Sequence, residues 1–220
     1  MNGFKIIISN YKTIQISKQQ GVLLLKFNRP EANNSINSTL IKEIIEVFTE
    51  VKENTTIKVI VLEGNTKHFC TGMDFQAVSE ENKDALIGNG PNDYYNMLNH
   101  ITFCSKVVVA KVDGKVNAGG VGIVAASDIV IASDQSTFGL SEALFGLLPA
   151  CVMPFLIKRI GVQKAQWMTF TTQGISAKRA YEIGLVDELS LNTQDTLRRN
   201  LLRLTRLETS TILKLNGFDK

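Results

Sequence analysis

The sequence predicts an α/β protein in which helices pack around a mainly parallel sheet. Three segments rich in β-branched residues, 58–64, 106–112 and 128–132, are each closed by Gly, Asp or Ser and predict buried strands. Segments with apolar residues at helical spacing lie before and between them. Buried strands that alternate with helices in this way are typical of parallel sheets.

A hairpin is predicted at the start of the fold. Residues 13–16 alternate between polar and apolar, residues 21–27 form an apolar run, and residues 19–21 have the composition of a turn. Apolar residues then recur at helical spacing over 40–51, behind Ser38, which we expect to cap this helix. Strand and helix therefore begin to alternate early in the chain.

The remainder of the chain combines loops and helices. Residues 78–93 are polar and rich in Gly and Asn, and we expect either a mobile segment over a site or a plain surface loop. An apolar-periodic segment, 94–103, follows them. After Pro149 the pattern is helical, with Gly184 as a stop before a Leu-rich and Arg-rich segment at 197–207.

Length and composition indicate one globular protein with a substantial core. The 220 residues are 44% apolar and 20% charged, which is ordinary for a globular chain. The net charge of +3 is too small to suggest a nucleic-acid partner. Residues 151–220 contain eleven Lys and Arg residues and six Asp and Glu residues, which gives a net charge of +5, whereas residues 1–150 have a net charge of −2. Such a basic region either meets an acidic partner or is the solvated surface of helices.

Cysteine usage and the amino terminus predict a cytoplasmic protein. Cys70, Cys104 and Cys151 have neither paired spacing nor a metal-binding pattern with the two histidines, so we expect reduced thiols and no disulfide. Residues 1–11 are less apolar than a signal-peptide core, and no apolar run approaches the ~18 residues needed to span a bilayer. We therefore expect no membrane association.

Two parts of the chain contain residues that point to chemistry. Residues 114–122 place Gly119 and Gly120 at a predicted helix start, where backbone N–H groups are free, and Glu142 is a carboxylate among apolar neighbours. An enolate needs donors for its oxygen and a base for its proton. A second loop, 68–75, leaves the neighbouring strand at the end where α/β sheets bind ligands. The glycines also suit close packing alone, and the carboxylate also suits a helix amino terminus.

Five motifs occur in a consistent order along the chain. Phe69-Cys70-Thr71-Gly72-Met73-Asp74-Phe75 resembles Phe-Cys-Ala-Gly-Ala-Asp-Leu, and Asn28–Asn37 resembles Asn-Arg-Pro-x-x-x-Asn-Ala-Leu-Asn. The other three motifs lie at 112–128, 138–149 and 180–187. All five resemble signatures of the crotonase (enoyl-CoA hydratase/isomerase) superfamily.

The resemblance implies a fold and a division of the chain. The expected fold is α/β, the crotonase (ClpP/crotonase-like) fold, with repeated ββα units and helices around a mainly parallel sheet. Residues 1–190 would form the crotonase core domain, and residues 191–220 a C-terminal helical segment that is shorter than usual for the family. The resemblance also implies a homotrimer or a dimer of trimers.

Catalytic roles follow from the same resemblance. The backbone N–H groups of Met73 and Gly119 would form the oxyanion hole for a thioester carbonyl, and Glu142 would move the α-proton. The family normally has another glutamate three residues after the Gly119 position, where this chain has Gly122. Hydratases are thought to use two carboxylates, whereas isomerases, dehydratases and decarboxylases include single-acid members. If its apolar neighbours surround Glu142 in space, desolvation would raise its pKa.

A narrower resemblance indicates the substrate. Residues 29–34, 115–120, 140–142 and 149–159 are similar to the stand-alone enoyl-CoA hydratase homologues of polyketide β-branching cassettes. These proteins dehydrate a 3-hydroxy-3-methylglutaryl group on an acyl carrier protein to 3-methylglutaconyl, and a partner decarboxylase acts next. The resemblance implies a phosphopantetheine-bound thioester on carrier protein or CoA, polyketide synthase cassette enzymes as partners, and no metal or redox cofactor.

Such a substrate has a free carboxylate and a departing hydroxyl, and each needs a polar contact. Lys115 and His68 are the candidates for the carboxylate, because they lie beside the two oxyanion loops in sequence. Asn117, Tyr94 and Tyr95 are candidates to assist the hydroxyl, and the sequence does not choose among them.

The phosphates of the carrier arm also need cations. Arg29 and the basic pair Lys158–Arg159 are the candidates for these contacts. Thr71, Asp74 and Gly120 complete the expected substrate-binding positions, since they lie in the two motifs that form the oxyanion hole.

Other functions stay open at this point. An enoyl-CoA hydratase/isomerase acting on a CoA thioester also fits a one-base site, whereas a decarboxylase is disfavoured by Glu142. A catalytically silent binding subunit is favoured by Gly122 and by a chain that stops at Lys220.

Overall fold

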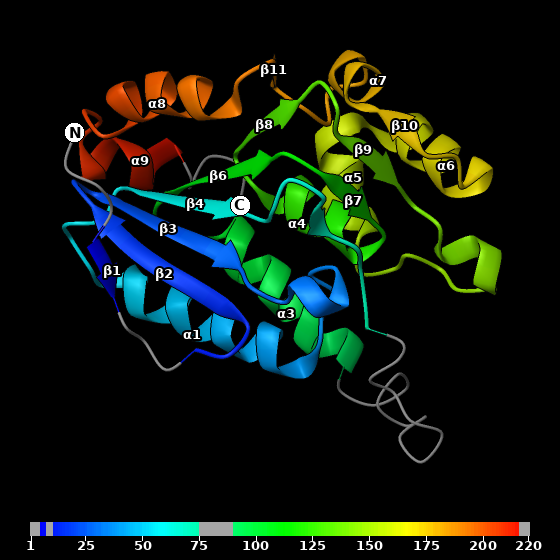
Figure 1. Ribbon diagram of the computed structural model, residues 1–220, viewed down its shortest axis with the longest axis horizontal. Helices are drawn as coiled ribbons and strands as arrows, with labels where there is room; N and C mark the ends of the chain where they lie inside the picture. Colours follow the sequence, from blue (N-terminus) through cyan, green and yellow to red (C-terminus); the bar gives the residue numbers. More distant parts are fainter. Residues whose placement is uncertain (1–4, 8–10, 75–89, 216–220) are drawn as a thin grey trace.

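An antiparallel hairpin lies next to the edge of the main sheet, as the sequence predicts. The computed structural model describes residues 5–7, 11–74 and 90–215 (Figure 1). Strands β2 (Ile14–Gln19) and β3 (Val22–Phe27) pair antiparallel, and β1 (Lys5–Ile7) joins β2 at the edge. The turn places Gln20 at φ 43° and Gly21 at φ 81°, two left-handed residues that suit a tight hairpin.

Four further strands continue this sheet in parallel. They are β4 (Val59–Glu63), β6 (Val107–Val112), β8 (Ile129–Ser133) and β11 (Glu188–Ser190), and the order is β1-β2-β3-β4-β6-β8-β11. The first three match the predicted strands, so those predictions are confirmed. Strand β11 has three residues, too few to show a periodicity in the sequence.

A second, smaller sheet contains the strands that lead to the motifs. Its order is β10-β9-β7-β5, with β5 (His68–Cys70), β7 (Lys115–Asn117), β9 (Thr137–Gly139) and β10 (Ile175–Ser176). Because β5, β7 and β9 are parallel, the loops that follow them emerge at one edge. The sequence did not predict these short strands.

Helices cover both faces of the main sheet (Figure 1). On one face, α1 (Ser38–Lys52) packs beside α3 (Gly90–Thr102) over the larger apolar core. On the other face, α8 (Thr193–Leu204) buries Leu197 in a smaller cluster with sheet residues such as Val61. The sheet is therefore buried on both sides, which explains why its strands are apolar throughout.

Among the remaining helices, α4 (Gly119–Ala126) packs directly against the smaller sheet and is buried along its whole length. The other elements are η1 (Pro30–Ala32), η4 (Glu142–Phe145), α5 (Met153–Ile160), α6 (Val162–Thr171), α7 (Ala177–Glu182) and α9 (Thr209–Leu215). Both α8 and α9 belong to the predicted C-terminal helical segment.

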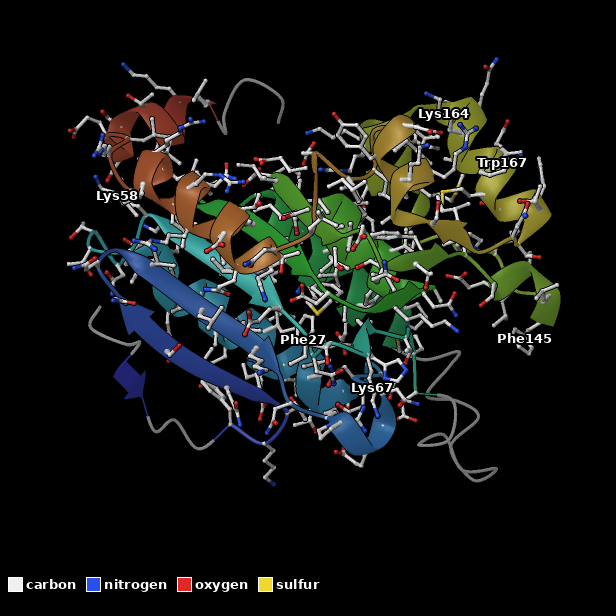
Figure 2. The ribbon with its side chains drawn as sticks, turned by 45° about the horizontal axis from the view of Figure 1, so that its top comes forward. Phe27, Lys58, Lys67, Phe145, Lys164 and Trp167 are labelled. Carbon is white, nitrogen blue, oxygen red and sulfur yellow. The ribbon has the colours of Figure 1, made fainter. Side chains whose placement is uncertain are left out.

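Lys58 ties the start of β4 to the end of α8. Its Nζ donates to the carbonyl oxygens of Thr205 at 3.0 Å and Leu207 at 2.8 Å, and Figure 2 shows Lys58 beside this connection. Thr205 is the C-cap residue of α8 and Leu207 lies in the turn that follows, so the ammonium group satisfies carbonyl groups just beyond the helix end.

One prediction about the helices is wrong, and another falls mostly on residues outside those that the structure describes. Asn37, not Ser38, caps α1, because the Asn37 Oδ1 accepts a hydrogen bond from the Leu40 N–H at 2.9 Å. Of the polar segment 78–93, the part up to residue 89 lies outside the described residues, and residues 90–93 form the first turn of α3.

Three further features concern membrane segments, metal sites and thiols in the described part of the chain. No helix there is long and apolar enough to cross a membrane. No group of three or more His, Cys, Asp and Glu residues is arranged there to hold a metal ion. The three cysteines are free thiols, as expected.

Candidate active site

The loops after β5, β7 and β9 meet at one edge of the smaller sheet. They contain Met73, Gly119 and Glu142, the three residues that the sequence assigns to catalysis. Strand β7 is central, with β5 on one side and β9 on the other. The topology therefore brings together three residues that are far apart in the chain.

Met73 presents a backbone N–H that no described residue accepts. It forms a parallel bridge with Ile36, in which the Ile36 N–H donates to the Gly72 carbonyl at 2.7 Å and the Asp74 N–H donates to the Ile36 carbonyl at 2.9 Å. In a parallel bridge of this kind, the N–H of the middle residue points away from the partner segment. The Met73 N–H is thus directed to the other side of the loop.

Gly119 is the first residue of α4, where a helix has no internal acceptor for the N–H group. Ala118 before it has φ 47° and ψ −121°, a conformation that L-residues rarely adopt. The Ala118 N–H donates to the Gly139 carbonyl at 2.9 Å, which anchors this loop to β9. Strain of about 1–3 kcal/mol at such a residue persists only where the surroundings hold it, and it is common at functional sites.

The two N–H groups lie close together because the backbones approach closely. A Cβ added to Gly72 would lie 3.3 Å from the Gly119 nitrogen and 2.7 Å from the Ala118 Cβ. A Cβ added to Gly120 would overlap the Cys70 carbonyl oxygen. Glycine is therefore required at positions 72 and 120 by space, and Gly72 also has φ 93°.

Glu142 is the first residue of the short turn η4, next to Ser141. The Asn117 Nδ2 donates to the Ser141 Oγ at 2.9 Å, so strand β7 holds the segment that carries the carboxylate. The Glu142 Oε2 is buried and has no hydrogen-bond partner among the described residues. Burial raises the pKa of Glu142, and hydrogen bonds from the backbone N–H groups of Glu142 and Ser141 partly offset that rise.

This arrangement suits enolate chemistry. Two backbone donors can stabilise an oxyanion, and a partly desolvated carboxylate with a free oxygen can accept a proton. The helix-terminal alternative for Glu142 accounts for part of its contacts, because backbone N–H groups do reach the carboxylate. It does not account for the unpartnered Oε2.

Lys115 and His68 lie opposite each other on neighbouring strands, at some distance from the N–H groups of Met73 and Gly119. They are register partners at the starts of β7 and β5, and both strands run from them toward Gly119 and Met73. At about 3.3 Å per residue, the start of β7 lies on the order of 10 Å from the Gly119 end.

Arg29 makes several contacts within the protein. Its Nη2 forms an ion pair with Asp74 at 2.8 Å, its Nη1 donates to the Ser35 carbonyl at 2.5 Å, and its side chain is 12% exposed. Thr71 Oγ1 donates to the Asn33 carbonyl at 3.1 Å. In the structure these side chains shape the loop that presents the Met73 N–H.

Arg159 is engaged in a similar way. Its Nε donates to the Leu185 carbonyl at 2.9 Å, its Nη1 donates to the Ser127 carbonyl at 2.7 Å, and its Nη2 pairs with Asp187. All three guanidinium nitrogens thus hold α5 to neighbouring loops.

Asn34 is a site residue that the sequence analysis missed. It is fully buried at φ 55°; its Oδ1 accepts from the Arg29 N–H and its Nδ2 donates to the His68 carbonyl, both at 3.0 Å. The side chain joins the loop after β3 to the start of β5. The sequence signal was an Asn-Asn pair, a residue type that tolerates the left-handed region.

Comparisons with known proteins agree with this geometry. Residues 17–218 match the family model described as enoyl-CoA hydratase/isomerase. The chain belongs to this family. It is an enoyl-CoA hydratase-like enzyme of the hydro-lyase type, and the predicted crotonase fold is confirmed.

Relatives within the family include proteins of several activities. Bacillaene synthase dehydratase PksH of Bacillus subtilis (strain 168) is 44% identical over 209 residues, which cover 94% of this chain and 80% of PksH. A solved structure of the Bacillus subtilis polyketide biosynthesis enoyl-CoA hydratase (pksH) matches with a TM-score of 0.88 and 43% identity, over 95% of this chain and 83% of that one. Trans-2-decenoyl-[acyl-carrier-protein] isomerase of Streptococcus mutans is 30% identical over 186 residues, 80% of this chain and 69% of that protein.

The close approach at Gly120 generates a first prediction. Gly120→Ala is expected to lower the melting temperature strongly or to prevent folding, because the new methyl group overlaps the Cys70 carbonyl. Gly174→Ala is the matched control, since a Cβ there meets open space. Thermal unfolding of both variants checks this, and equal stability of the two would contradict the packing described above.

Burial of Glu142 generates a prediction about pH. A folded-state pKa above the unfolded value means that the ionised carboxylate costs stability at high pH and that the cost disappears below the unfolded pKa. Glu142→Gln should therefore melt at a higher temperature than the wild type at about pH 8, with a difference that shrinks toward the ordinary Glu pKa of about 4.3. Exposed Glu50→Gln should show no such trend. A gain that is the same at every pH would refute the assignment.

Proposed function

We propose that this enzyme dehydrates a 3-hydroxy-3-methylglutaryl thioester on an acyl carrier protein to the 3-methylglutaconyl thioester, in the β-branching of a polyketide. One observation carries the proposal most directly. The carboxylate of Glu142 stands by itself at the edge where the two N–H donors meet, with its Oε2 buried and unpartnered among the described residues. A glycine occupies position 122, where a second acid would be expected in a hydratase.

The reaction needs one base and one oxyanion site. Glu142 takes a proton from the carbon next to the thioester carbonyl, and the negative charge that develops on the carbonyl oxygen is stabilised by the N–H groups of Met73 and Gly119. The electron pair of the enolate then forms the new double bond as the hydroxyl departs. Protonated Glu142 returns its proton to that hydroxyl, which leaves as water, so the carboxylate is ionised again at the end.

The character of the substrate fits a site with one acid. A tertiary carbon shares developing positive charge more readily than a secondary one, so its hydroxyl needs less help from a dedicated acid. The substrate also carries a carboxylate, and a second negative side chain beside Glu142 would repel it. A single carboxylate avoids that repulsion.

The relatives support the polyketide context and the carrier. PksH is described as a bacillaene synthase dehydratase, and the Streptococcus mutans relative acts on an acyl-carrier-protein thioester. The excess of basic residues from Cys151 onward suits an acidic carrier protein. We also expect the homotrimer or dimer of trimers that the family resemblance implies. A contact between copies would cover Leu144, Phe145 and Leu148, which are 68%, 73% and 83% exposed. Such apolar exposure is typical of a contact surface, and Figure 2 shows Phe145 at the outer end of its segment.

An isomerase that moves a double bond is the second candidate, since it too needs one base. To distinguish the two activities, the enzyme is incubated with the hydroxymethylglutaryl thioester of the carrier protein and the mass of the acyl group is measured by mass spectrometry. Loss of one water supports the dehydratase. An unchanged mass with this substrate, together with double-bond migration in an enoyl thioester, would establish the isomerase, and no product from either would indicate a binding subunit.

The role of Glu142 as base predicts a large loss of activity in one variant. Glu142→Gln should bind the acyl thioester but turn it over ~10²–10⁴ times more slowly, the usual contribution of general acid–base catalysis. Glu50→Gln, an exposed change on α1, serves as the control. Turnover by Glu142→Gln at the rate of the wild type would rule out this mechanism.

The carrier proposal predicts a preference that depends on salt. The carrier-bound acyl group should give a higher kcat/KM than the CoA ester at low ionic strength, and the gap should narrow as salt shortens the screening length below ~10 Å. Measurements of kcat/KM for both esters over a series of salt concentrations test this. Equal values at low salt would contradict the choice of partner.

A further inference from the structure

Tyr94 connects helix α3 to one of the two oxyanion donors. Its side chain is only 4% exposed, and its hydroxyl donates a hydrogen bond to the Gly119 carbonyl oxygen at 2.5 Å. A Cβ added to Gly119 would lie 3.3 Å from the same hydroxyl oxygen. The phenol therefore packs against the backbone of the residue whose N–H serves the site.

The backbone at Gly119 needs such an anchor. Two consecutive glycines, Gly119 and Gly120, have no side chains to restrict them, and Ala118 before them is in a strained conformation. The Ala118 N–H is held by the Gly139 carbonyl, on the side before Gly119. The Tyr94 hydroxyl holds the Gly119 carbonyl, on the carboxyl side of the Gly119 Cα. The peptide unit between these two groups, which carries the Gly119 N–H, is held by the Val121 N–H, which donates to the Ala118 carbonyl at 2.8 Å. Tyr94 fixes the peptide unit that follows, so the three hydrogen bonds together hold the direction of the Gly119 N–H.

Gly122 leaves room for the Tyr94 hydroxyl. A Cβ at position 122 would overlap that oxygen, and it would also lie 3.1 Å from the Val152 Cγ2 and 3.2 Å from the Leu98 Cδ1. A side chain of any size at position 122 would have to displace Tyr94. The glycine and the tyrosine are therefore spatially coupled.

The phenol keeps its proton in this environment. Burial raises the pKa of Tyr94 well above its ordinary value, and Cys70, Glu142 and Cys151 raise it further. The proton is directed to the Gly119 carbonyl. Tyr94 can therefore hold the backbone without exchanging a proton with a substrate.

We propose that Tyr94 is a positioning residue that orients the Gly119 N–H of the oxyanion hole, and that Gly122 is the partner that makes room for it. The inference rests on the proposed function in one respect, namely that a thioester carbonyl is the group bound at these donors. Tyr95 beside it has a different environment, since it is 40% exposed and its ring packs on Phe155 with centroids 5.6 Å apart.

The carbonyl stretch of a bound thioester tests the proposal directly. The 3-methylglutaryl thioester of the carrier protein, which lacks the departing hydroxyl, is prepared with carbon-13 in its thioester carbonyl, bound to the protein and observed by isotope-edited infrared spectroscopy. Two N–H donors polarise the carbonyl and lower its stretching frequency. Tyr94→Phe, which removes only the hydroxyl, should lose roughly half of this shift, because one of two donors is misdirected. Tyr181→Phe, the same change on the exposed side of α7, should keep it.

The outcomes separate the inference from the proposed function. A full shift in Tyr94→Phe would overturn the inference while the proposed function stands. No shift in the wild-type protein would overturn the proposed function, and the inference with it. Loss of the shift in Tyr94→Phe with an unchanged melting temperature supports the positioning role over a merely structural one.

Kinetics provide an independent test that includes position 122. Tyr94→Phe should lower kcat by about tenfold, the size expected for one hydrogen bond, with KM changed by less than about twofold. Gly122→Ala alone should lower kcat at least as much, because the new methyl displaces the hydroxyl. The double variant that combines Tyr94→Phe with Gly122→Ala should have a kcat only slightly below that of Tyr94→Phe alone, because the oxygen that the new methyl group would overlap is gone. Fully additive losses would overturn the coupling, and if Gly122→Ala does not fold, the infrared result on Tyr94→Phe decides.

Discussion

The site depends on how closely two backbone segments approach each other, the end of β5 and the start of α4. The Cys70 carbonyl lies where a side chain at Gly120 would be, and Gly72 faces the Ala118 Cβ and the Gly119 nitrogen. This contact brings the N–H groups of two distant loops to one place. Because the donors are backbone groups, the side chain at Met73 can vary, whereas the glycines around it cannot.

The charges of the site follow from that geometry. The carboxylate of Glu142 is held through Ser141 by Asn117, which belongs to the same strand that leads to Gly119. The donor and the base therefore both lie in segments that directly follow strands of the small sheet, Gly119 after β7 and Glu142 after β9. A neutral phenol, from Tyr94, fills the space beside Gly122. Among the described residues, the site thus combines two neutral backbone donors with the carboxylate of Glu142, and a neutral group beside Gly122 adds no charge that would repel the anionic substrate proposed above.

The sequence predicted the main sheet well and the smaller sheet poorly. Long β-branched runs such as 58–64 identify buried strands, but strands of three residues such as β5 have no period to detect. The cap of α1 was misplaced by one residue because Asn37 and Ser38 are both good capping residues. Met73 and Gly119 came from motif resemblance, and the structure shows why the resemblance concerns backbone positions. The contacts of Tyr94 and Asn34 depend on tertiary packing and could not be found from spacing.

The proposed reaction depends on one step, in which Glu142 removes the proton next to a thioester carbonyl that the two N–H groups polarise. Exchange of that proton with solvent tests it without any dehydration, if the 3-methylglutaryl thioester of the carrier protein, which lacks the hydroxyl, is incubated in deuterium oxide. We expect the wild-type enzyme to introduce deuterium at this carbon, detected by mass spectrometry, and Glu142→Gln to introduce it ~10²–10⁴ times more slowly. Equal exchange by the two proteins, or none by the wild type, would contradict the proposed step.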